Sequence, residues 1–251
     1  MLGMAAQWSG RMDRCANAVA PMLVSRMQGK CKSTFCQLLM PDGLRDYYTD
    51  SFELTGQSGC EQKLAQFGLI NLDEYDRLSP QKLPLLKTLM QMKKLDFRKS
   101  HRSSYSHLPR MASFIGTSNH KDLLTDPTGS RRFICIEVTG TIDTNKAIDY
   151  EQLYAQAMYE IHHGERYWFD SEDEQIMTEN NREFEQTPAM LQLFYQYFKT
   201  AQTKEEGEFL TPVEILNYLK KKSGMSLSDN KVYHFGRLLQ KCGIPSKHTY
   251  K

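Results

Sequence analysis

Four short apolar runs constrain the fold of this chain more than any other feature of its sequence. They occupy residues 18–25, 67–72, 111–118 and 133–138, and polar residues bound each of them. Apolar runs of this length are typical of strands buried on both faces of a parallel sheet. Between the second and third runs, SPQKLPLLKTLM has Pro80 at a first helical position and leucines at helical spacing. Strands that alternate with helices predict an α/β fold, with a mainly parallel sheet covered on both faces.

The size, charge and cysteine content of the chain limit its class. Its 251 residues, 40% of them hydrophobic, suffice for one large domain or for a medium and a small one. The net charge of +2 does not by itself indicate nucleic-acid binding. The six cysteines lack a C-x-x-C pair or zinc-finger spacing, which favours reduced thiols. No apolar stretch has membrane-spanning length, so we expect a cytoplasmic protein with no membrane partner. Because the first residues have the pattern of an interior helix, we also expect a fragment of a longer protein.

The segment SRMQGKCKSTF, which follows the first run, has the length of a phosphate-binding loop, G-x-x-x-x-G-K-[ST]. Lys32 and Ser33 fit the end of that motif, but Arg26 and Cys31 occupy both glycine positions. In such a loop the backbone N–H groups surround the phosphates, the lysine binds the outer phosphates and the hydroxyl binds Mg²⁺. The residues expected to bind a nucleotide are Gln28, Gly29, Lys30, Cys31, Lys32, Ser33 and Thr34.

The missing glycines carry a cost. A non-glycine residue in a strained backbone conformation costs about 1–3 kcal/mol, which predicts nucleotide binding weakened by roughly ten- to a hundredfold. Gly29 retains some freedom in the middle of the loop. In the alternative interpretation, Ser33 and Thr34 merely cap the helix that follows, and the loop binds no nucleotide.

Acidic and amide residues follow the second and third apolar runs. Asp73 and Glu74 come after one of these strands, and Asn119 comes after the other. An acid at a strand end can hold Mg²⁺, its neighbour can polarise the attacking water, and an amide can orient that water against the terminal phosphate. Such residues also occur in ordinary turns. Their interpretation as a catalytic site therefore depends on the phosphate-binding loop that occurs in the same chain.

Two basic segments extend this hypothesis. Arg131 and Arg132 precede the fourth run, and a guanidinium there could reach the terminal phosphate on a neighbouring subunit. Residues 93–110 carry six Lys or Arg residues against one Asp, with aromatic residues between them. That composition suits single-stranded nucleic acid. The alternative for both segments is a solvated basic loop. The residues of the second segment expected to contact DNA are Arg98, Lys99 and Arg102.

Four segments carry a family resemblance: QGKCKSTF, FGLINLDE, PRMASFIGTSN and DPTGSRRF. Together they resemble the virulence-associated protein E family, whose ATPase domain is similar to superfamily 3 helicases of viruses and mobile elements. The resemblance covers residues 1–170 and implies an AAA+-like P-loop core that assembles as a ring, with ATP between subunits. It also implies a pore-facing hairpin where residues 93–110 lie.

The resemblance assigns roles residue by residue. The implied roles are phosphate binding by Lys32, Mg²⁺ binding by Ser33 and Asp73, activation of water by Glu74, detection of the terminal phosphate by Asn119, and a finger acting in trans at Arg131 or Arg132.

The sequence after Gly140 changes to polar helices. Residues 171–202 are predicted to form a helical connector, which opens with the capping sequence S-E-D-E at residues 171–174. The stretch TKEEGE, residues 203–208, is predicted to be a linker to a last domain, residues 209–251.

This last domain is predicted to be a helix-turn-helix that resembles a winged-helix domain with a truncated wing. Its first helix opens with a capping box at Thr211 and Glu214. Lys231 and Arg237, on the polar side of the second helix, suit DNA phosphates or base edges. An ordinary basic surface is the alternative.

These features together predict a Mg²⁺-dependent ATPase that acts on single- or double-stranded DNA in a mobile genetic element or prophage. It would be a homo-oligomeric, helicase-like motor or a replication initiator. One alternative is a DNA-binding protein whose degenerate loop uses nucleotide only for assembly. Another is a small-molecule kinase, against which the trans-acting arginines and the basic segment argue.

Overall fold

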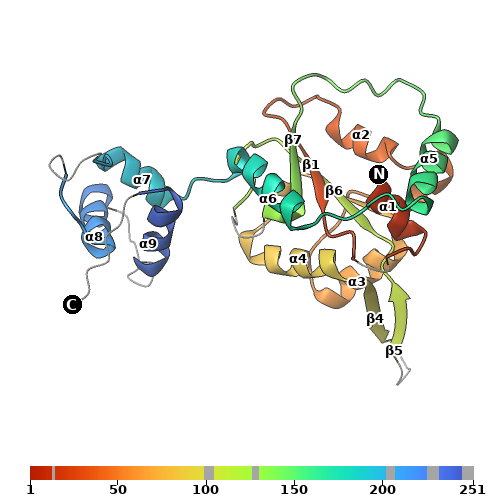
Figure 1. Ribbon diagram of the computed structural model, residues 1–251, viewed down its shortest axis with the longest axis horizontal. Helices are drawn as coiled ribbons and strands as arrows, with labels where there is room; N and C mark the ends of the chain where they lie inside the picture. The colour runs from red at the N-terminus through yellow and green to blue at the C-terminus, as the bar shows by residue number, and fades with distance from the viewer. Residues whose placement is uncertain (13–14, 99–104, 126–129, 202–206, 225–231, 245–251) are drawn as a thin grey trace. The chain divides into compact units, whose positions relative to one another are not determined.

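The structure, a computed structural model, describes residues 1–251 apart from residues 13–14, 99–104, 126–129, 202–206, 225–231 and 245–251. The chain divides into two compact units, Met1–Gln186 and Thr187–Lys251 (Figure 1). No helix in the described part of the chain is both long and apolar enough to span a membrane.

A five-stranded sheet forms the centre of the first unit. Its strand order is β2-β3-β6-β1-β7, and all of its neighbouring strands pair in parallel. The four predicted apolar runs supply four of these strands, which confirms the α/β fold with a parallel sheet. The strands are β1 (Ala20–Val24), β2 (Tyr48–Thr49), β3 (Leu69–Leu72), β6 (Ser113–Ser118) and β7 (Phe133–Glu137).

Helices cover both faces of this sheet (Figure 1). Apolar side chains of α1 (Leu2–Trp8), α2 (Lys32–Leu38) and α5 (Tyr150–His162) pack against one face, where Leu69 and Ile115 point. The next residue along β3, Ile70, points to the other face, because side chains alternate along a strand.

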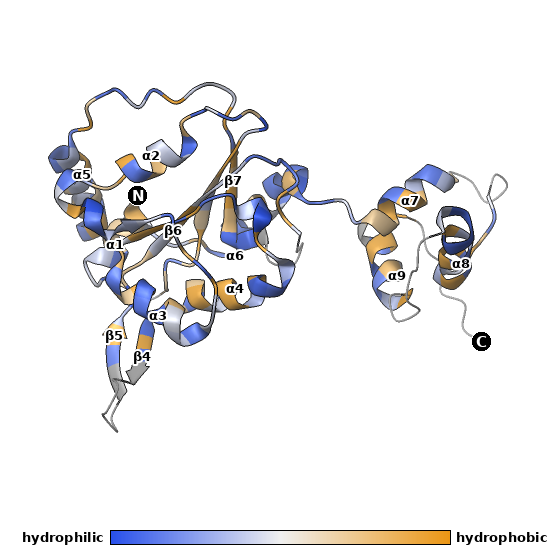
Figure 2. Cartoon of the chain, turned by 180° about the vertical axis from the view of Figure 1, so that it is seen from behind, coloured by the Kyte–Doolittle hydropathy of each residue, from blue (hydrophilic) through white to orange (hydrophobic). Residues whose placement is uncertain are grey.

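Helices α3 (Gln57–Gln66) and α4 (Leu83–Gln91) pack on this second face. Helix α4 is largely hydrophobic, as its buried position requires, whereas α6 (Ser171–Asn180) is largely hydrophilic (Figure 2). Short 3₁₀ turns connect several elements: η1 (Asp42–Tyr47), η2 (Tyr75–Arg77), η3 (Pro80–Lys82), η4 (Ser130–Arg132) and η5 (Asn181–Phe184).

A separate antiparallel hairpin projects from this unit (Figure 1). It consists of β4 (Lys94–Arg98) and β5 (Tyr105–Pro109), which pair from Lys94↔Pro109 to Arg98↔Tyr105. The hairpin that the family resemblance implied is therefore present, although the residues 99–104 between its strands lie outside the described part of the chain.

The base of the hairpin is held by a buried arginine, Arg110. Its guanidinium donates to the carbonyls of Leu89 and Met90 at the end of α4, and to Gln7 and Asn17 near the N-terminus. Burial lowers its pKa to about 10, so the side chain remains a cation at neutral pH. The residue that follows β5 thus ties the end of α4 to the N-terminal segment through one charge.

The predicted connector, residues 171–202, is shared between the two units. Its first helix, α6, packs against η4 and β7 within the first unit. The capping box of α6 lies one residue earlier than predicted, because Asp170 accepts the N–H of Asp173 and the Asp173 carboxylate accepts the N–H of Asp170. Its second helix, α7 (Ala189–Tyr197), belongs to the second unit.

Among its described residues, the second unit contains the helices α7, α8 (Pro212–Ser223) and α9 (Val232–Lys241). They share one core, which includes Phe194, Leu219 and Phe235. The predicted capping box of α8 is confirmed, because Thr211 and Glu214 exchange backbone and side-chain hydrogen bonds. The predicted wing lies almost wholly among residues 245–251, outside the described residues.

Candidate nucleotide-binding site

The segment between β1 and α2 forms a tight loop at the carboxyl end of the sheet. It is fixed at its start by the N–H of Ser25, which donates to the carbonyl of Ser118 over 3.1 Å. Within it, both Gly29 (φ 75°) and Cys31 (φ 59°, ψ 26°) adopt the left-handed conformation. Cys31 thus takes a backbone conformation that favours glycine, which is the kind of strain expected where a motif glycine is replaced.

A cavity of about 230 Å³ opens beside this loop. Its walls come from the loop and from the ends of β3 and β6, three segments far apart in the sequence. Each loop residue from Gln28 to Thr34 that the sequence predicted lines the cavity, together with Asp73, Glu74, Thr117 and Asn119.

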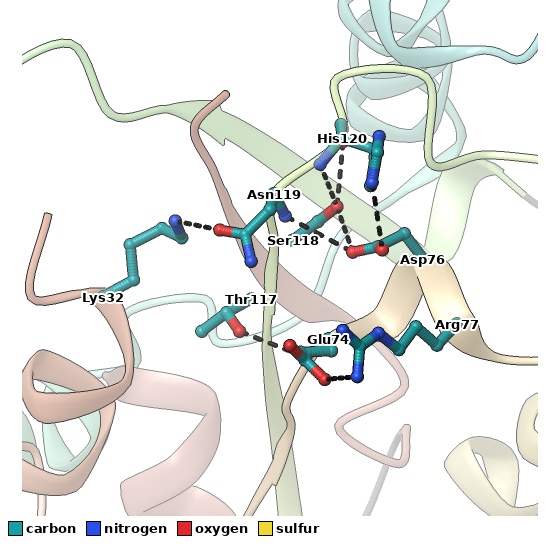
Figure 3. Close-up of polar contacts among 8 residues, drawn as sticks. All are labelled: Lys32, Glu74, Asp76, Arg77, Thr117, Ser118, Asn119 and His120. Carbon is teal, nitrogen blue, oxygen red and sulfur yellow. Dashed lines mark hydrogen bonds and ion pairs between the residues drawn. The ribbon is translucent and has the colours of Figure 1, made fainter. Parts of the chain in front are cut away.

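Lys32 is a buried cation at the wall of this cavity. Its Nζ donates to Oδ1 of Asn119 over 3.0 Å, and the residue is only 7% exposed (Figure 3). Burial lowers the pKa of Lys32, while the charges of Asp73 and Asp76 act in the opposite direction. A lysine held beside two carboxylates and a polar cavity is poised to bind an anion.

Ser33 and Asp73 present oxygens side by side. Ser33 Oγ donates to Asp73 Oδ1 over 2.8 Å, and Thr117 Oγ1 donates to the same oxygen over 2.5 Å. Two oxygens that occupy adjacent corners of a Mg²⁺ octahedron, each about 2.0–2.1 Å from the ion, are about 2.9 Å apart. The spacing and oxygen chemistry of Ser33 and Asp73 therefore fit a Mg²⁺ ion.

Glu74 also lines the cavity, but its carboxylate has a partner. The residue adopts a left-handed conformation (φ 48°), and its N–H lies 3.4 Å from Thr117 Oγ1. Its Oε2 lies 2.6 Å from Nη1 of Arg77, one turn further along the chain (Figure 3). The candidate base is thus paired with an exposed arginine.

Asp76 lies behind the cavity and contacts the end of β6. Its Oδ1 accepts from Ser118 Oγ over 2.8 Å and from the N–H of Asn119 over 3.3 Å. Its Oδ2 is 3.8 Å from Nε2 of His120 (Figure 3). One carboxylate therefore contacts three successive residues, the middle of which faces Lys32.

The predicted finger residues lie away from this cavity. Arg131 donates to Glu174 of α6 over 3.0 Å, and Arg132 is half-buried in η4. Neither residue lines the cavity.

The predicted DNA contacts fall only in part on described residues. Arg98 ends β4, and Arg237 on α9 donates to the hydroxyl of Tyr233 over 2.7 Å and stacks on its ring. Lys99, Arg102 and Lys231 lie outside the part of the chain that the structure describes.

Two residues of the site were missed from the sequence, namely Thr117 and Asp76. Thr117 lies two positions before Asn119 and therefore on the same side of β6, which was the one available signal. Asp76 follows Asp73 by three residues within a turn, and nothing in that spacing indicates its contact with β6.

A parallel sheet with a phosphate loop after β1 and an acidic pair after β3 defines a P-loop domain of the nucleotide-binding class. The family model described as the virulence-associated protein E-like domain matches residues 12–186. The chain therefore belongs to the virulence-associated protein E-like family, as the resemblance predicted. Membership of this family, together with the loop, implies nucleotide binding.

Residues 187–251 match a second model, described as a domain of unknown function from B. Theta (DUF3874). The two matches meet where the structure divides into two units. A search of the curated proteins found no match.

Among solved structures, the chain is similar to the apo structure of the NrS-1 C-terminal region, with 16% identity and a TM-score of 0.41 over 96% of this chain and 57% of that one. It is also similar to the A form of that apo structure, with 18% identity and a TM-score of 0.37 over 72% of this chain and 39% of that one. The chain thus spans little more than half, or less, of the length of these structures.

Proposed function

We propose that this chain is a Mg²⁺-dependent ATPase that acts on DNA, as a helicase-like motor or replication initiator of a mobile genetic element or prophage. The observation that carries the proposal is the convergence of three segments on one polar cavity. The loop brings Lys32 and Ser33, β3 brings Asp73, and β6 brings Asn119.

Each residue has a distinct task in this proposal. The backbone N–H groups of the loop and Lys32 bind the phosphates, and Ser33 and Asp73 hold Mg²⁺. When bound, Mg²⁺ neutralises negative charge on the phosphate oxygens. Glu74 accepts a proton from the attacking water, and Asn119 contacts the terminal phosphate.

The contacts within the cavity indicate what nucleotide binding must displace. Lys32 has to exchange its hydrogen bond with Asn119 for a phosphate, and Ser33 has to exchange Asp73 for the ion. Glu74 has to leave Arg77 before it can act as a base. All three exchanges substitute one polar partner for another, so none leaves a buried charge without a partner.

The assembly and DNA contacts belong to the same proposal. An AAA+-like core would form a homo-oligomeric ring in which Arg131 or Arg132 completes the site of a neighbouring subunit. Strand order supports this core, because β6 separates the loop strand β1 from the acidic strand β3 and so presents Asn119 between them.

DNA would contact the β4–β5 hairpin through Arg98, Lys99 and Arg102, and a winged-helix-like second unit through Lys231 and Arg237. Among these five residues, Arg237 is the one whose side-chain contacts the structure describes. It forms a cation–π pair with the exposed Tyr233.

The test is ATP hydrolysis over a range of protein concentrations, with and without Mg²⁺ and single-stranded DNA. We expect activity that requires Mg²⁺, rises more than linearly with protein concentration and increases with DNA. Lys32→Ala should abolish it, whereas Lys146→Ala, which changes an exposed lysine away from the cavity, should not. Linear, DNA-independent activity would instead favour a kinase-like enzyme.

A mixing experiment tests the trans arginine. Arg131→Ala or Arg132→Ala removes a finger, and Glu74→Gln removes the base in a different subunit. If one arginine acts in trans, mixing its variant with Glu74→Gln restores part of the activity, because some interfaces then contain an intact base and an intact finger. Absence of rescue for both arginines would contradict the trans role.

The second candidate is a nucleotide-dependent assembly or DNA-binding protein without turnover. The observations that favour it are the loss of both motif glycines and the ion pair that occupies Glu74. Nucleotide binding that depends on Lys32, combined with hydrolysis no faster than that of Lys32→Ala, would replace the motor with this role.

A further inference from the structure

Asp76 connects the acidic segment after β3 to the end of β6. We propose that Asp76 is a positioning residue, which holds Asn119 in the orientation that distinguishes a nucleoside triphosphate from a diphosphate. This inference rests on the proposed nucleotide-binding function of the same cavity.

The first support is the burial and the hydrogen bonding of the carboxylate. The Asp76 side chain is only 14% exposed, and an ionised carboxylate in such a position needs hydrogen bonds to offset its lost hydration. Asp76 Oδ1 receives two of them, from Ser118 Oγ and from the N–H of Asn119. Both donors belong to the turn that carries the Asn119 side chain.

The second support is the direction of the Ser118 hydroxyl. Ser118 Oγ lies 2.8 Å both from Asp76 Oδ1 and from the carbonyl of His120, and 3.0 Å from the N–H of His120. A hydroxyl has a single proton, and an ionised acceptor makes the stronger bond. Ser118 therefore donates to Asp76 and accepts from His120 N–H, so Asp76 fixes the turn on both sides of Asn119.

The third support is the opposite end of the Asn119 side chain. Its Oδ1 accepts from Lys32 Nζ over 3.0 Å at the wall of the cavity (Figure 3). The backbone of Asn119 is thus bound to Asp76 while its amide faces the place where a terminal phosphate would lie. A turn released from Asp76 would lose that direction, while the loop would keep its backbone N–H groups for the inner phosphates.

The inference predicts a loss of selectivity with little loss of binding. In the full chain with Mg²⁺, we expect calorimetry to show tighter binding of the triphosphate analogue AMP-PNP than of ADP. Asp76→Ala should reduce this preference by about tenfold, the equivalent of one hydrogen bond to a charged group at about 1.4 kcal/mol. ADP affinity should change by less than about threefold, a shift of under about 0.7 kcal/mol.

Matched variants separate positioning from charge. Asp76→Asn keeps an oxygen acceptor for Ser118 and Asn119, so it should retain most of the preference. Asn119→Ala should lose the preference for AMP-PNP, as Asp76→Ala does. The double variant should lose little more than either single variant, because both substitutions remove the same interaction. Ser118→Ala, which removes one of the two hydrogen bonds, should give an intermediate loss even if Asp76→Ala fails to fold.

Three results would overturn the inference. Equal weakening of ADP and AMP-PNP in Asp76→Ala and Ser118→Ala would indicate a merely structural role. Additive losses in the double variant would show that Asp76 acts independently of Asn119. A wild-type chain that binds neither AMP-PNP nor ADP would refute the proposed function itself, and this inference with it. That outcome is distinct from failure of the inference alone, because it is already seen in the wild type, whereas the inference alone fails only in the variants.

Discussion

Cys31 provides the sharpest test of how this loop tolerates the loss of its glycine. The residue has φ 59° and ψ 26° in the folded chain, so we expect its backbone strain to be present whether or not a phosphate is bound. Replacing it by glycine, in Cys31→Gly, should therefore change the free energy of unfolding and leave nucleotide affinity almost unchanged.

The expected magnitude follows from two opposing terms. A left-handed conformation costs an L-residue about 1–2 kcal/mol, which glycine does not pay. Glycine in turn makes the unfolded chain more flexible, which costs about 0.5–1 kcal/mol. The thiol contributes little, since its closest hydrogen-bond contact is a 4.0 Å approach to the carbonyl of Gly29. Cys31→Gly should thus stabilise the first unit by about 0.5–1 kcal/mol, which raises its Tm by roughly 1–4 °C.

Gly29→Ala is the matched control in the same loop. Gly29 has φ 75°, and no atom lies within 4 Å of the position that a Cβ would take. The substitution therefore adds backbone strain without a steric clash, and should lower the stability of the unit by about 1 kcal/mol. If the free energy of unfolding rises in Cys31→Gly and falls by a similar amount in Gly29→Ala, backbone strain and not side-chain contact accounts for both changes.

The assay is thermal unfolding of both variants, combined with calorimetric binding of Mg·ATP. Strain that arises on binding would weaken nucleotide binding, whereas strain already present in the folded loop lowers the free energy of unfolding instead. If Cys31→Gly left Tm unchanged and tightened ATP binding tenfold or more, the strain would arise on binding, against this prediction.

Two further variants test contacts at the site, and a third tests the base of the hairpin. Arg77→Gln frees Glu74 from an exposed ion pair that is worth about 0.2–1 kcal/mol, so single-turnover hydrolysis should rise up to about fivefold, and a fall would contradict this. Thr117→Val removes a buried hydroxyl that donates to Asp73, so it should raise the Mg²⁺ concentration needed for activity. Thr117→Ser keeps the hydroxyl and should not, and equal effects of both substitutions would refute the role of the hydroxyl. Arg110→Met leaves several buried carbonyls without their donor and should lower the free energy of unfolding in urea by about 3–5 kcal/mol. Arg110→Lys should have an intermediate effect, and a loss below about 1 kcal/mol would contradict the role of Arg110 in holding the base of the hairpin.

The central strands β1, β3 and β6 were predictable because they are buried on both faces. Residues in β3 and β6 are buried along their whole length, so their apolar runs are continuous and bounded by polar residues. β2 contains only Tyr48–Thr49, too short to give a periodic signal. Helix α3 has few apolar residues and begins after Gly56 without a side-chain cap, so neither its pattern nor its start was visible in the sequence.

The site residues that directly follow strands could be predicted from the sequence. The contacts that depend on the order of the strands in the sheet could not. Asp73 and Asn119 directly follow predicted strands, and Lys32 ends the loop that follows another. Parallel strands bring such positions to one edge of the sheet. That Thr117 would contact Asp73, and that Asp76 would contact Ser118, depends on β6 lying next to β3. Local sequence carries no information on that adjacency.

The arginines at the start of β7 show how the parallel sheet constrains the proposed mechanism. The register pairs Ala20 with Phe133 and Val24 with Glu137, so Arg132 lies level with the beginning of β1, whereas the loop follows its end. Five residues of strand at about 3.3 Å each separate these levels by roughly 16 Å, a span longer than an arginine side chain.

Arg131 is further committed to Glu174 within its own chain. In this fold neither arginine can reach the phosphates bound by its own loop. A role at the terminal phosphate therefore requires a second subunit, and if subunit mixing gives no rescue, the Arg131–Glu174 pair is left with the structural task of holding α6 against the start of β7.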